Sequence, residues 1–177
     1  MNKLPPNQND VQLRCCGGFV VFARDRLQTL HTILVRTPNT KDGGGGKYGF
    51  PKGKFNKIRD KTHLDTASRE LLEESSLTLE DIEIIPNLLL KEFNQKGNLS
   101  VAYYVAKLKT ELEQKPLAAQ DPEELASVEY VPVQDALRLR PFVFYERRQD
   151  LLKQAMDIYL KHEQQSIECN QNQIVCI

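Results

Sequence analysis

Apolar and polar positions in the first part of the chain follow a pattern that predicts short β-strands. Residues 14–23 (RCCGGFVVFA) are rich in β-branched and aromatic residues, and residues 30–36 (LHTILVR) alternate loosely between the two classes. Two such runs in succession are typical of a β-hairpin. The Gly17–Gly18 pair within the first run indicates a bulge or a close approach of another backbone. A short strand that ends in a turn is expected at residues 48–53 (YGFPKG).

The pattern then changes to a helical period over residues 64–75, where Leu64, Ala67 and Leu71 fall on one stripe. Thr62 or Asp65 is expected to cap this helix. The remaining elements are strands at 82–93, 99–108 and about 128–131, a hairpin loop at 94–98, and helices at 133–137 and from 145 to about 163.

This order of elements predicts an α/β/α sandwich, in which a mixed β-sheet carries a helix on each face. We expect one domain over residues 14–163, a disordered N-terminal segment over residues 1–13, and a polar, flexible tail over residues 164–177. The glycines at 43–46 predict a mobile surface loop, because a phosphate-binding P-loop requires Ser or Thr after the lysine that follows its glycines.

Composition and charge exclude several classes of protein. Lys and Arg number 24, as do Asp and Glu, so the chain lacks the basic excess typical of proteins that hold nucleic acid by its backbone. No run approaches the ~20 apolar residues of a membrane helix, and the polar N-terminus does not resemble a signal peptide. We therefore expect no membrane association and a cytoplasmic or nuclear protein. Four cysteines without a C-x₂-C spacing, and three scattered histidines, do not predict a zinc site.

The candidate chemistry lies on the helix at 64–75. Glu70, Glu73 and Glu74 are three and four positions apart, so a helix places their carboxylates on one side. Like charges at this spacing cost about 0.2–0.5 kcal/mol per pair, which Arg69 or a hard cation such as Mg²⁺ would offset. On this stretch alone, a solvated acidic face of the helix is the favoured interpretation.

The segment before the helix changes that balance, because it carries a cationic patch. Its members are Lys52, Lys54, Lys57, Arg59 and Lys61. Carboxylates that hold cations beside a run of lysines suit the binding and cleavage of a polyphosphate. The alternative, a solvated loop, is weighted evenly for Lys57 and Lys61 and less for the two lysines that flank the turn at Gly53.

Together these residues resemble the Nudix box, Gly-x₅-Glu-x₇-Arg-Glu-U-x-Glu-Glu-x-Gly-U, where U is a bulky aliphatic residue. The matching positions are Gly53, Arg69, Glu70, Leu71, Glu73, Glu74 and Leu77. The flanking strands also occur in the family's order, so the resemblance covers roughly residues 14–163, although only the box is specific.

The chain departs from the box in three ways. Gly53 and Arg69 lie two positions further apart than in the pattern, so Lys61 stands where the loop glutamate belongs and Asp60 is the nearest acid. These two departures put the bracing of the loop against the helix in doubt. The late glycine is replaced by Ser76, which suits a left-handed helix cap less well.

The resemblance implies a Nudix-type fold and a hydrolase that depends on Mg²⁺, with Mn²⁺ as the alternative metal. Glu70, Glu73 and Glu74 would be the metal ligands, Arg69 would hold them, and Glu73 or Glu74 would activate a water. An acid in the loop before the last strand would assist as a second ligand or base, and of Asp121, Glu123 and Glu124 we choose Glu124. Lys52, Gly53 and Lys54 would contact the substrate.

The implied reaction cleaves a phosphoanhydride bond in a nucleoside diphosphate linked to another group. The lysines at the turn favour a dinucleoside polyphosphate or a capped or 5′-phosphorylated RNA end, ahead of an inositol pyrophosphate. A nucleoside triphosphate is compatible as well. The alternative class is a binding or regulatory module that kept the fold and lost the activity, which the displaced loop acid and Ser76 favour.

Overall fold

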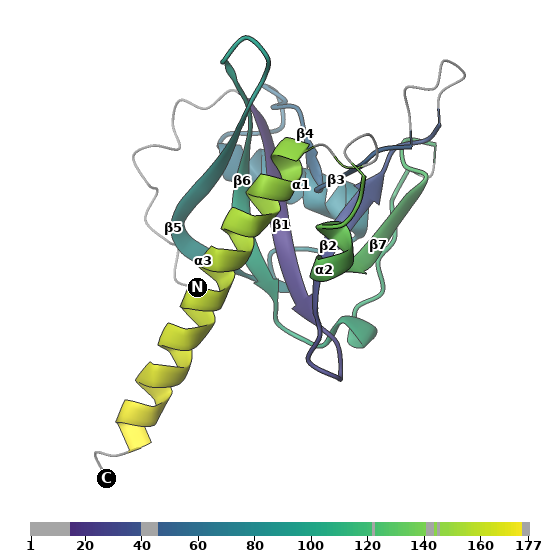
Figure 1. Cartoon of the computed structure of the whole chain (residues 1–177). Helices are drawn as coiled ribbons and strands as arrows, with labels where there is room; N and C mark the ends of the chain where they lie inside the picture. The colour runs from purple at the N-terminus through teal and green to yellow at the C-terminus, as the bar shows by residue number, and fades with distance from the viewer. Residues whose placement is uncertain (1–14, 40–45, 122, 141–143, 145, 175–177) are drawn as a thin grey trace.

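Seven strands form a mixed sheet in the computed structural model of the chain, which describes residues 15–39, 46–121, 123–140, 144 and 146–174 (Figure 1). The strands are β1 (Cys16–Arg24), β2 (Leu30–Arg36), β3 (Tyr48–Gly49), β4 (Lys52–Gly53), β5 (Ile82–Phe93), β6 (Leu99–Leu108) and β7 (Ser127–Pro132). The helices are α1 (His63–Ser75), α2 (Val133–Ala136) and α3 (Glu146–Ile174), with a 3₁₀ turn at Leu112–Gln114. The expected strands and helices are all present.

β1 lies at the centre of the sheet. It runs parallel to β6 and antiparallel to β2, while β5 pairs with β6 and β7 pairs with β2. The β1–β2 ladder covers only the end of β1, from Phe22 to Arg24. At its start, β1 pairs instead with β4, through Gly17 and Gly18. The two central strands therefore splay apart toward the start of β1.

The segment Tyr48–Gly53, here called the strap, fills the opening between these two strands. Its first two residues pair with the end of β2 as β3, and its last two pair with the start of β1 as β4. Between them, Phe50 is fully buried, and the carbonyl of Pro51 accepts the backbone N–H of Phe19 at 3.0 Å. The expected short strand at 48–53 is thus two strands joined by a buried turn.

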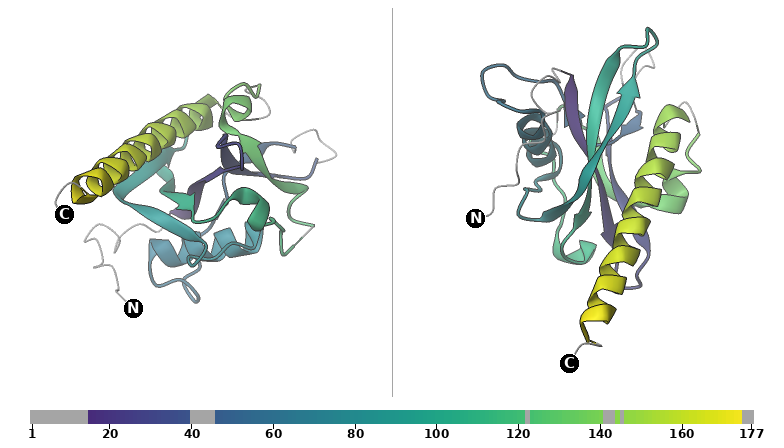
Figure 2. Two further views of the ribbon diagram at one scale, coloured as in Figure 1. Left: turned by 90° about the horizontal axis from the view of Figure 1, so that it is seen from below. Right: turned by 90° about the vertical axis from the view of Figure 1, so that its left-hand side faces the viewer.

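Helices cover both faces of the sheet, as the two views of Figure 2 show. Because side chains alternate along a strand, β1 sends Val20 and Phe22 into a core with α3, and Phe19 and Val21 into a second core with α1. The α/β/α sandwich expected from the sequence is confirmed.

The expected close approach at Gly17–Gly18 is present, and β1 keeps a regular register with β6 there, without a bulge. A side chain at Gly17 would collide with the backbone of α1 at His63 and Ala67. A side chain at Gly18 would collide with the strap at Pro51. The two glycines therefore let the helix and the strap pack directly onto the central strand.

α3 is longer than the sequence pattern predicted. We expected the helix to end near Glu163 and residues 164–177 to form a flexible tail, but the helix continues to Ile174. The expected helix end was wrong because residues 164–174 contain no Gly or Pro that would interrupt the backbone hydrogen bonding. The polar composition of the segment made it look like a tail. The flexibility of this segment stays a prediction.

Three expectations fall outside the described residues: the disordered segment at 1–13, most of the glycine loop at 43–46, and the chain end at 175–177. Within the described residues, no helix combines the length and apolar character required to cross a lipid bilayer.

Candidate active site

α1 presents its glutamates to the strap because both of its ends are fixed. The side chain of Thr62 accepts the backbone N–H of Asp65, and the side chain of Asp65 accepts the backbone N–H of Thr62, so both expected caps act together in a capping box. At the other end, Ser76 adopts the left-handed conformation with φ 61°. Its hydroxyl donates to the carbonyl of Ala118 at 2.8 Å. Serine therefore forms the cap that usually favours glycine, with an additional anchor to the loop before β7.

Glu70 lies directly over Gly53. A side chain at Gly53 would overlap the Glu70 carboxylate, so glycine is required for this close approach. Burial raises the pKa of Glu70, and the nearby carboxylates of Glu73 and Glu124 raise it further, against the lowering effect of Arg69. The glycine of the turn thus makes room for a buried carboxylate.

Glu74 is the most perturbed carboxylate of the site. Its Oε2 accepts the backbone N–H of Lys52 at 2.8 Å, which joins α1 to the strap. Burial, followed by repulsion from Glu70 and Glu124, raises its pKa to about 7, despite the lowering effect of the Lys52 N–H. No salt bridge reaches Glu74 in the described part of the chain. Its negative charge is therefore poorly compensated, as is common at functional sites.

Arg69 connects the loop to the helix through Asp60. Its guanidinium donates to both carboxylate oxygens of Asp60, from Nε at 3.1 Å and from Nη2 at 3.0 Å. Nη2 also donates to the backbone carbonyl of Lys54 at 2.9 Å. Asp60 is buried and accepts two further bonds, from the hydroxyl of Thr66 and the backbone N–H of Asn56. The loop is therefore braced, in spite of the two-residue insertion.

The charges of this brace stabilise each other. Burial opposes ionisation of Asp60, but the hydrogen bonds from Arg69, Asn56 and Thr66 hold its pKa below the usual value. The hydrogen bond to Asp60 raises the pKa of Arg69 well above its usual value. A bidentate arginine–carboxylate pair of this kind fixes geometry as well as charge.

Glu73 occupies a different environment from the other two glutamates. Its carboxylate is 37% exposed and pairs with Nη1 of Arg69 at 3.0 Å and with Nη1 of Arg59 at 3.8 Å. Nη1 of Arg69 also pairs with Oε1 of Glu70 at 2.6 Å. Within the described residues, no three Asp, Glu, His or Cys side chains are arranged to hold a metal ion. Glu73 would have to leave its arginines to join a metal.

The residues nevertheless fit a hard divalent cation in their chemistry. The partly buried carboxylates of Glu70 and Glu74 repel each other, and Glu124 adds to the negative potential at both. Oxygen ligands with excess negative charge are what Mg²⁺ prefers. Glu124 itself is exposed and lies in a turn, in which its backbone N–H donates to the carbonyl of Asp121. Glu124 is thus close enough to act electrostatically on Glu70 and Glu74, and its role as a metal ligand or base stays a prediction.

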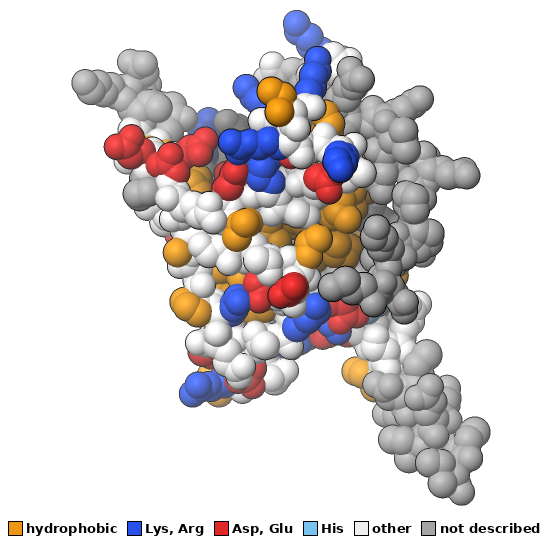
Figure 3. Space-filling model, turned by 180° about the vertical axis from the view of Figure 1, so that it is seen from behind, with side chains coloured by type: hydrophobic (Ala, Val, Ile, Leu, Met, Phe, Trp, Pro, Cys, Tyr) orange, Lys and Arg blue, Asp and Glu red, His pale blue; other side chains and the backbone are white. Residues whose placement is uncertain are grey.

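The lysines around the turn at Gly53 contribute in two ways: two of them contact the helix through their backbones, and several expose their charged side chains. Lys52 donates its N–H to Glu74 and Lys54 offers its carbonyl to Arg69, while the side chains of Lys54, Lys57 and Lys61 are exposed. The face that carries α1 shows Lys and Arg side chains beside acidic ones across its upper part (Figure 3).

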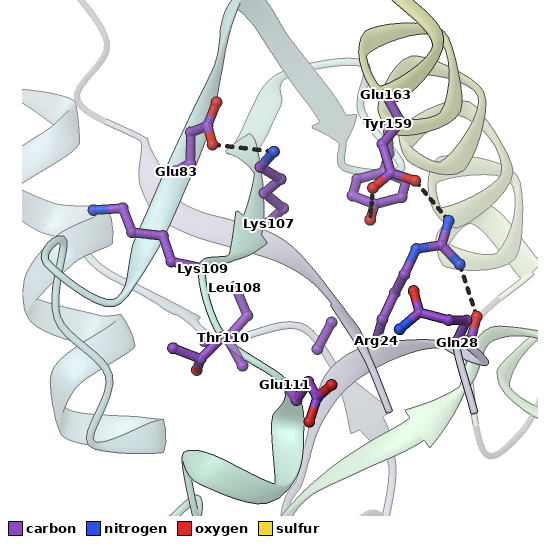
Figure 4. Close-up of a pocket in the computed structure, with 11 residues that line it drawn as sticks. Arg24, Gln28, Glu83, Lys107, Leu108, Lys109, Thr110, Glu111, Tyr159 and Glu163 are labelled. Atoms are coloured by element: carbon purple, nitrogen blue, oxygen red, sulfur yellow. Dashed lines mark hydrogen bonds and ion pairs between the residues drawn. The ribbon is translucent and has the colours of Figure 1, made fainter. Parts of the chain in front are cut away.

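A separate hollow of about 340 Å³ lies at the far end of β1 from the strap. Four of its charged side chains form two internal pairs: Arg24 with Glu163 at 2.6 Å, and Lys107 with Glu83 at 3.1 Å (Figure 4). Lys109 and Glu111, which also line it, interact with residues outside the hollow. These internal pairs leave little unbalanced charge for a ligand. The hollow is therefore a weaker candidate than the glutamates of α1.

Sequence reasoning missed the role of Asp60 and left the raised pKa of Glu74 unforeseen. A signal for the first was present, because Asp60 is the only acid between Gly53 and Thr62 and therefore the only loop partner available to Arg69. No signal announced the second, which depends on burial against the strap.

Comparisons with known proteins agree with this geometry. The model of the Nudix domain family matches residues 17–153. A search of curated proteins found no match. Among solved structures, the Ap4A hydrolase of C. elegans in a binary complex is similar, with a TM-score of 0.64 and 20% identity over 83% of this chain and 98% of that chain.

Two other structures show the same fold. The Nudix domain of Shewanella oneidensis NrtR, complexed with ADP ribose, has a TM-score of 0.61 and 21% identity over 82% of this chain and 88% of that one. A mutT/nudix family protein from Listeria innocua has a TM-score of 0.58 and 25% identity over 83% and 94% of the two chains. The family match spans most of the domain, and Glu70 and Glu74 of the box contact the strap at Gly53 and Lys52, while Arg69 pairs with Glu70 and Glu73. This chain belongs to the Nudix family.

Proposed function

We propose that this protein is a pyrophosphohydrolase that uses a divalent cation, Mg²⁺ or Mn²⁺, to cleave a phosphoanhydride bond. The observation that carries the proposal is the pair of partly buried carboxylates, Glu70 and Glu74, held against the strap, where no salt bridge within the described residues reaches Glu74 and its pKa is raised. A polyphosphate substrate would add its negative charge to that of these carboxylates, so a cation is needed to neutralise both the phosphates and the glutamates.

The chain's own residues divide the work as follows. Glu70 and Glu74 would hold the cation, Glu73 would join them if it left Arg59 and Arg69, and Glu124 would support the site from the loop. A bound cation would supply neutralisation of the charge that develops on phosphorus and on the leaving phosphate. Glu73 or Glu74 takes the proton of the attacking water, and Arg69 keeps the glutamates oriented through Asp60.

For the substrate we propose a dinucleoside polyphosphate or a capped or 5′-phosphorylated RNA end, with an inositol pyrophosphate as the second choice. The support is the exposed cationic rim beside the glutamates, formed by Lys54, Lys57 and Lys61. Point charges of this kind suit a substrate with several phosphates. The C. elegans Ap4A hydrolase shares the fold, and Ap4A is accordingly one of the substrates to test.

The deciding experiment incubates the protein and Mg²⁺ with Ap4A, capped RNA, ADP-ribose, a nucleoside triphosphate and an inositol pyrophosphate, and measures released phosphate and mononucleotide. Substituting the general base is expected to lower kcat by about 10²–10⁴-fold at unchanged Mg²⁺ affinity, whereas loss of a metal ligand also weakens Mg²⁺ binding, so both quantities are measured for Glu73→Gln and Glu74→Gln. Glu80→Gln, on an exposed residue beyond α1, is the matched control. If neither substitution lowers turnover, our assignment of the base is wrong.

The second candidate is a binding module without catalytic activity. The observation in its favour is Glu73, whose charge is already satisfied by Arg59 and Arg69. Binding of Mg²⁺ and a polyphosphate with no turnover of any member of the panel would establish this alternative.

A further inference from the structure

We propose that Arg148, on the C-terminal helix α3, is a positioning residue for the glutamates of α1, acting through the strap from the opposite face of the sheet. The inference rests on the proposed function, and it identifies a part of the machinery that lies outside the residues of the box. It starts from the contacts of Arg148 with the strap.

Arg148 reaches the strap at its first two residues. Its Nη1 donates to the carbonyl of Tyr48 at 3.0 Å. A side chain at Gly49 would lie within 2.8 Å of the same nitrogen, so glycine keeps the path of the guanidinium open. The side chain of Arg148 is only 13% exposed. A buried arginine that holds a backbone carbonyl fixes the height of that backbone above the sheet.

A buried network holds Arg148 itself in place. Its Nε lies 3.6 Å from Oε2 of Glu92 on β5, and the same oxygen accepts the hydroxyl of Tyr103 on β6 at 2.9 Å. Tyr103 also packs its ring edge-on against Phe50 of the strap, with centroids 5.6 Å apart. The network thus contacts the strap twice, through a hydrogen bond and through an aromatic contact.

The strap transmits this position to the glutamates. Four residues beyond Tyr48, the N–H of Lys52 holds Glu74, and Gly53 lies beneath Glu70. The intervening turn is stiff, because Phe50 is fully buried and Pro51 accepts a hydrogen bond from β1. A shift at Tyr48 would therefore move the N–H that aims the Glu74 carboxylate. Displacements of about 1 Å at such supports can cost 10²-fold in rate.

Two arginines that are adjacent in the sequence make a matched test possible. Arg147 donates from Nη1 to the carbonyl of Phe93 at 2.9 Å, so it fastens α3 to the β5–β6 hairpin and does not contact the strap. Arg148→Lys keeps the charge beside Glu92 but removes the planar fork. Arg147→Lys makes the same chemical change at a site with no path to the glutamates.

The experiment measures kcat and KM on the substrate found by the panel, and the Mg²⁺ dissociation constant by calorimetry without substrate. For Arg148→Lys we expect kcat to fall and Mg²⁺ binding to weaken, each by about tenfold or more as is usual for supports of metal ligands, with KM changed less than about twofold. Arg147→Lys is expected to match the wild type in all three quantities.

A gentler substitution guards against a folding defect. Gly49→Ala displaces the guanidinium without removing its charge, and the free energy of unfolding is measured for every variant. If Arg148→Lys does not fold, Gly49→Ala must reproduce the fall in kcat and in Mg²⁺ affinity, or the proposal is wrong.

Each remaining outcome is also decisive. A rise in KM at unchanged kcat would mean that Arg148 binds substrate directly, and equal behaviour of the two Lys variants would mean that it is only structural. Either result overturns the positioning role. If the wild type binds Mg²⁺ but turns over no substrate, the proposed function fails, while the calorimetric comparison still tests the positioning of the glutamates.

Discussion

At two positions where the chain departs from the family pattern, the residue that is present makes contacts that offset the change. Asp60 stands one position before the place expected for the loop glutamate, yet it receives two hydrogen bonds from Arg69. Ser76 adopts a backbone conformation that usually favours glycine, and its hydroxyl gains a partner at Ala118 that glycine would lack. Asp60, on a loop with two extra residues, therefore braces the loop against α1 in place of the expected glutamate.

The raised pKa of Glu74 predicts a coupling between protons and metal. Since the folded protein holds a proton on Glu74 up to about pH 7 and the unfolded chain only up to about 4.5, the metal-free protein loses stability as pH rises through this window. A cation binds the ionised form, so binding at about pH 6.5 should release protons, and affinity should rise with pH until about 7.

Calorimetric titration of Mg²⁺ in two buffers with different ionisation enthalpies measures this release. Glu74→Gln should abolish it, while Glu80→Gln should leave it intact. Identical heats in the two buffers for the wild-type protein would show that Glu74 is already ionised before the metal arrives.

At the residue scale, the sequence predicted which side chains would meet but not the state of each. The spacing of Glu70, Glu73 and Glu74 placed them on one side of a helix, which the structure confirms. The sequence could not show that Glu70 and Glu74 would be partly buried against the strap, or that Arg59 and Arg69 would both pair with the more exposed Glu73. Burial depends on where the strap lies, and the strap is positioned by contacts distant in the sequence.

At the scale of elements, α1 and the strap form the site by direct backbone contact. Periodicity was sufficient to predict α1, its cap and the β5–β6 hairpin, because these depend on neighbouring residues. It could not predict that Tyr48–Gly53 would divide between two strands, since this follows from the splaying of β1 and β2. The end of α3 was missed for a related reason, because an exposed helix lacks the apolar period that marks a packed one.

The contact between Gly53 and Glu70 gives a prediction at this scale. Gly53→Ala places a methyl group where the Glu70 carboxylate lies, so the helix and the strap must separate. We expect Mg²⁺ affinity and kcat to fall by about 10–100-fold, as for other losses of ligand orientation. Calorimetry and steady-state kinetics measure the two effects.

Gly97→Ala is the matched control, because Gly97 has φ of +78° and open space around it in the β5–β6 hairpin. That variant should lose about 1–2 kcal/mol of stability through backbone strain and keep its metal affinity. If both alanine variants behave alike, the effect at Gly53 is one of stability and not of the site.

At the scale of the whole molecule, α3 has two parts with different roles. The first part packs on the sheet through Leu151, Leu152 and Tyr159, and the pair between Arg24 and Glu163 marks the end of these contacts. Beyond this point the helix extends past the sheet (Figures 1 and 2). Its described side chains there are mostly exposed, including Ile167 at 56%.

Removal of the residues after Gln165 should therefore leave the domain intact. We expect the free energy of unfolding to change by less than about 0.5 kcal/mol, as for surface changes that break no buried contact, and kcat to remain that of the full chain. Chemical denaturation and the hydrolysis assay check both expectations. A loss of several kcal/mol would reveal contacts made by this part of the helix that its exposure does not suggest.

The absence of side chains at Gly17, Gly18, Gly49 and Gly53 has a consequence for how such a protein can change. At these positions helix, strand and arginine meet with no spare volume, so a new methyl group would disturb several partners at once. We therefore expect substrate preference to vary through the exposed lysines at the periphery, whose side chains are less constrained by packing. An attempt to redesign selectivity would do best to leave the glycines untouched and randomise the cationic rim.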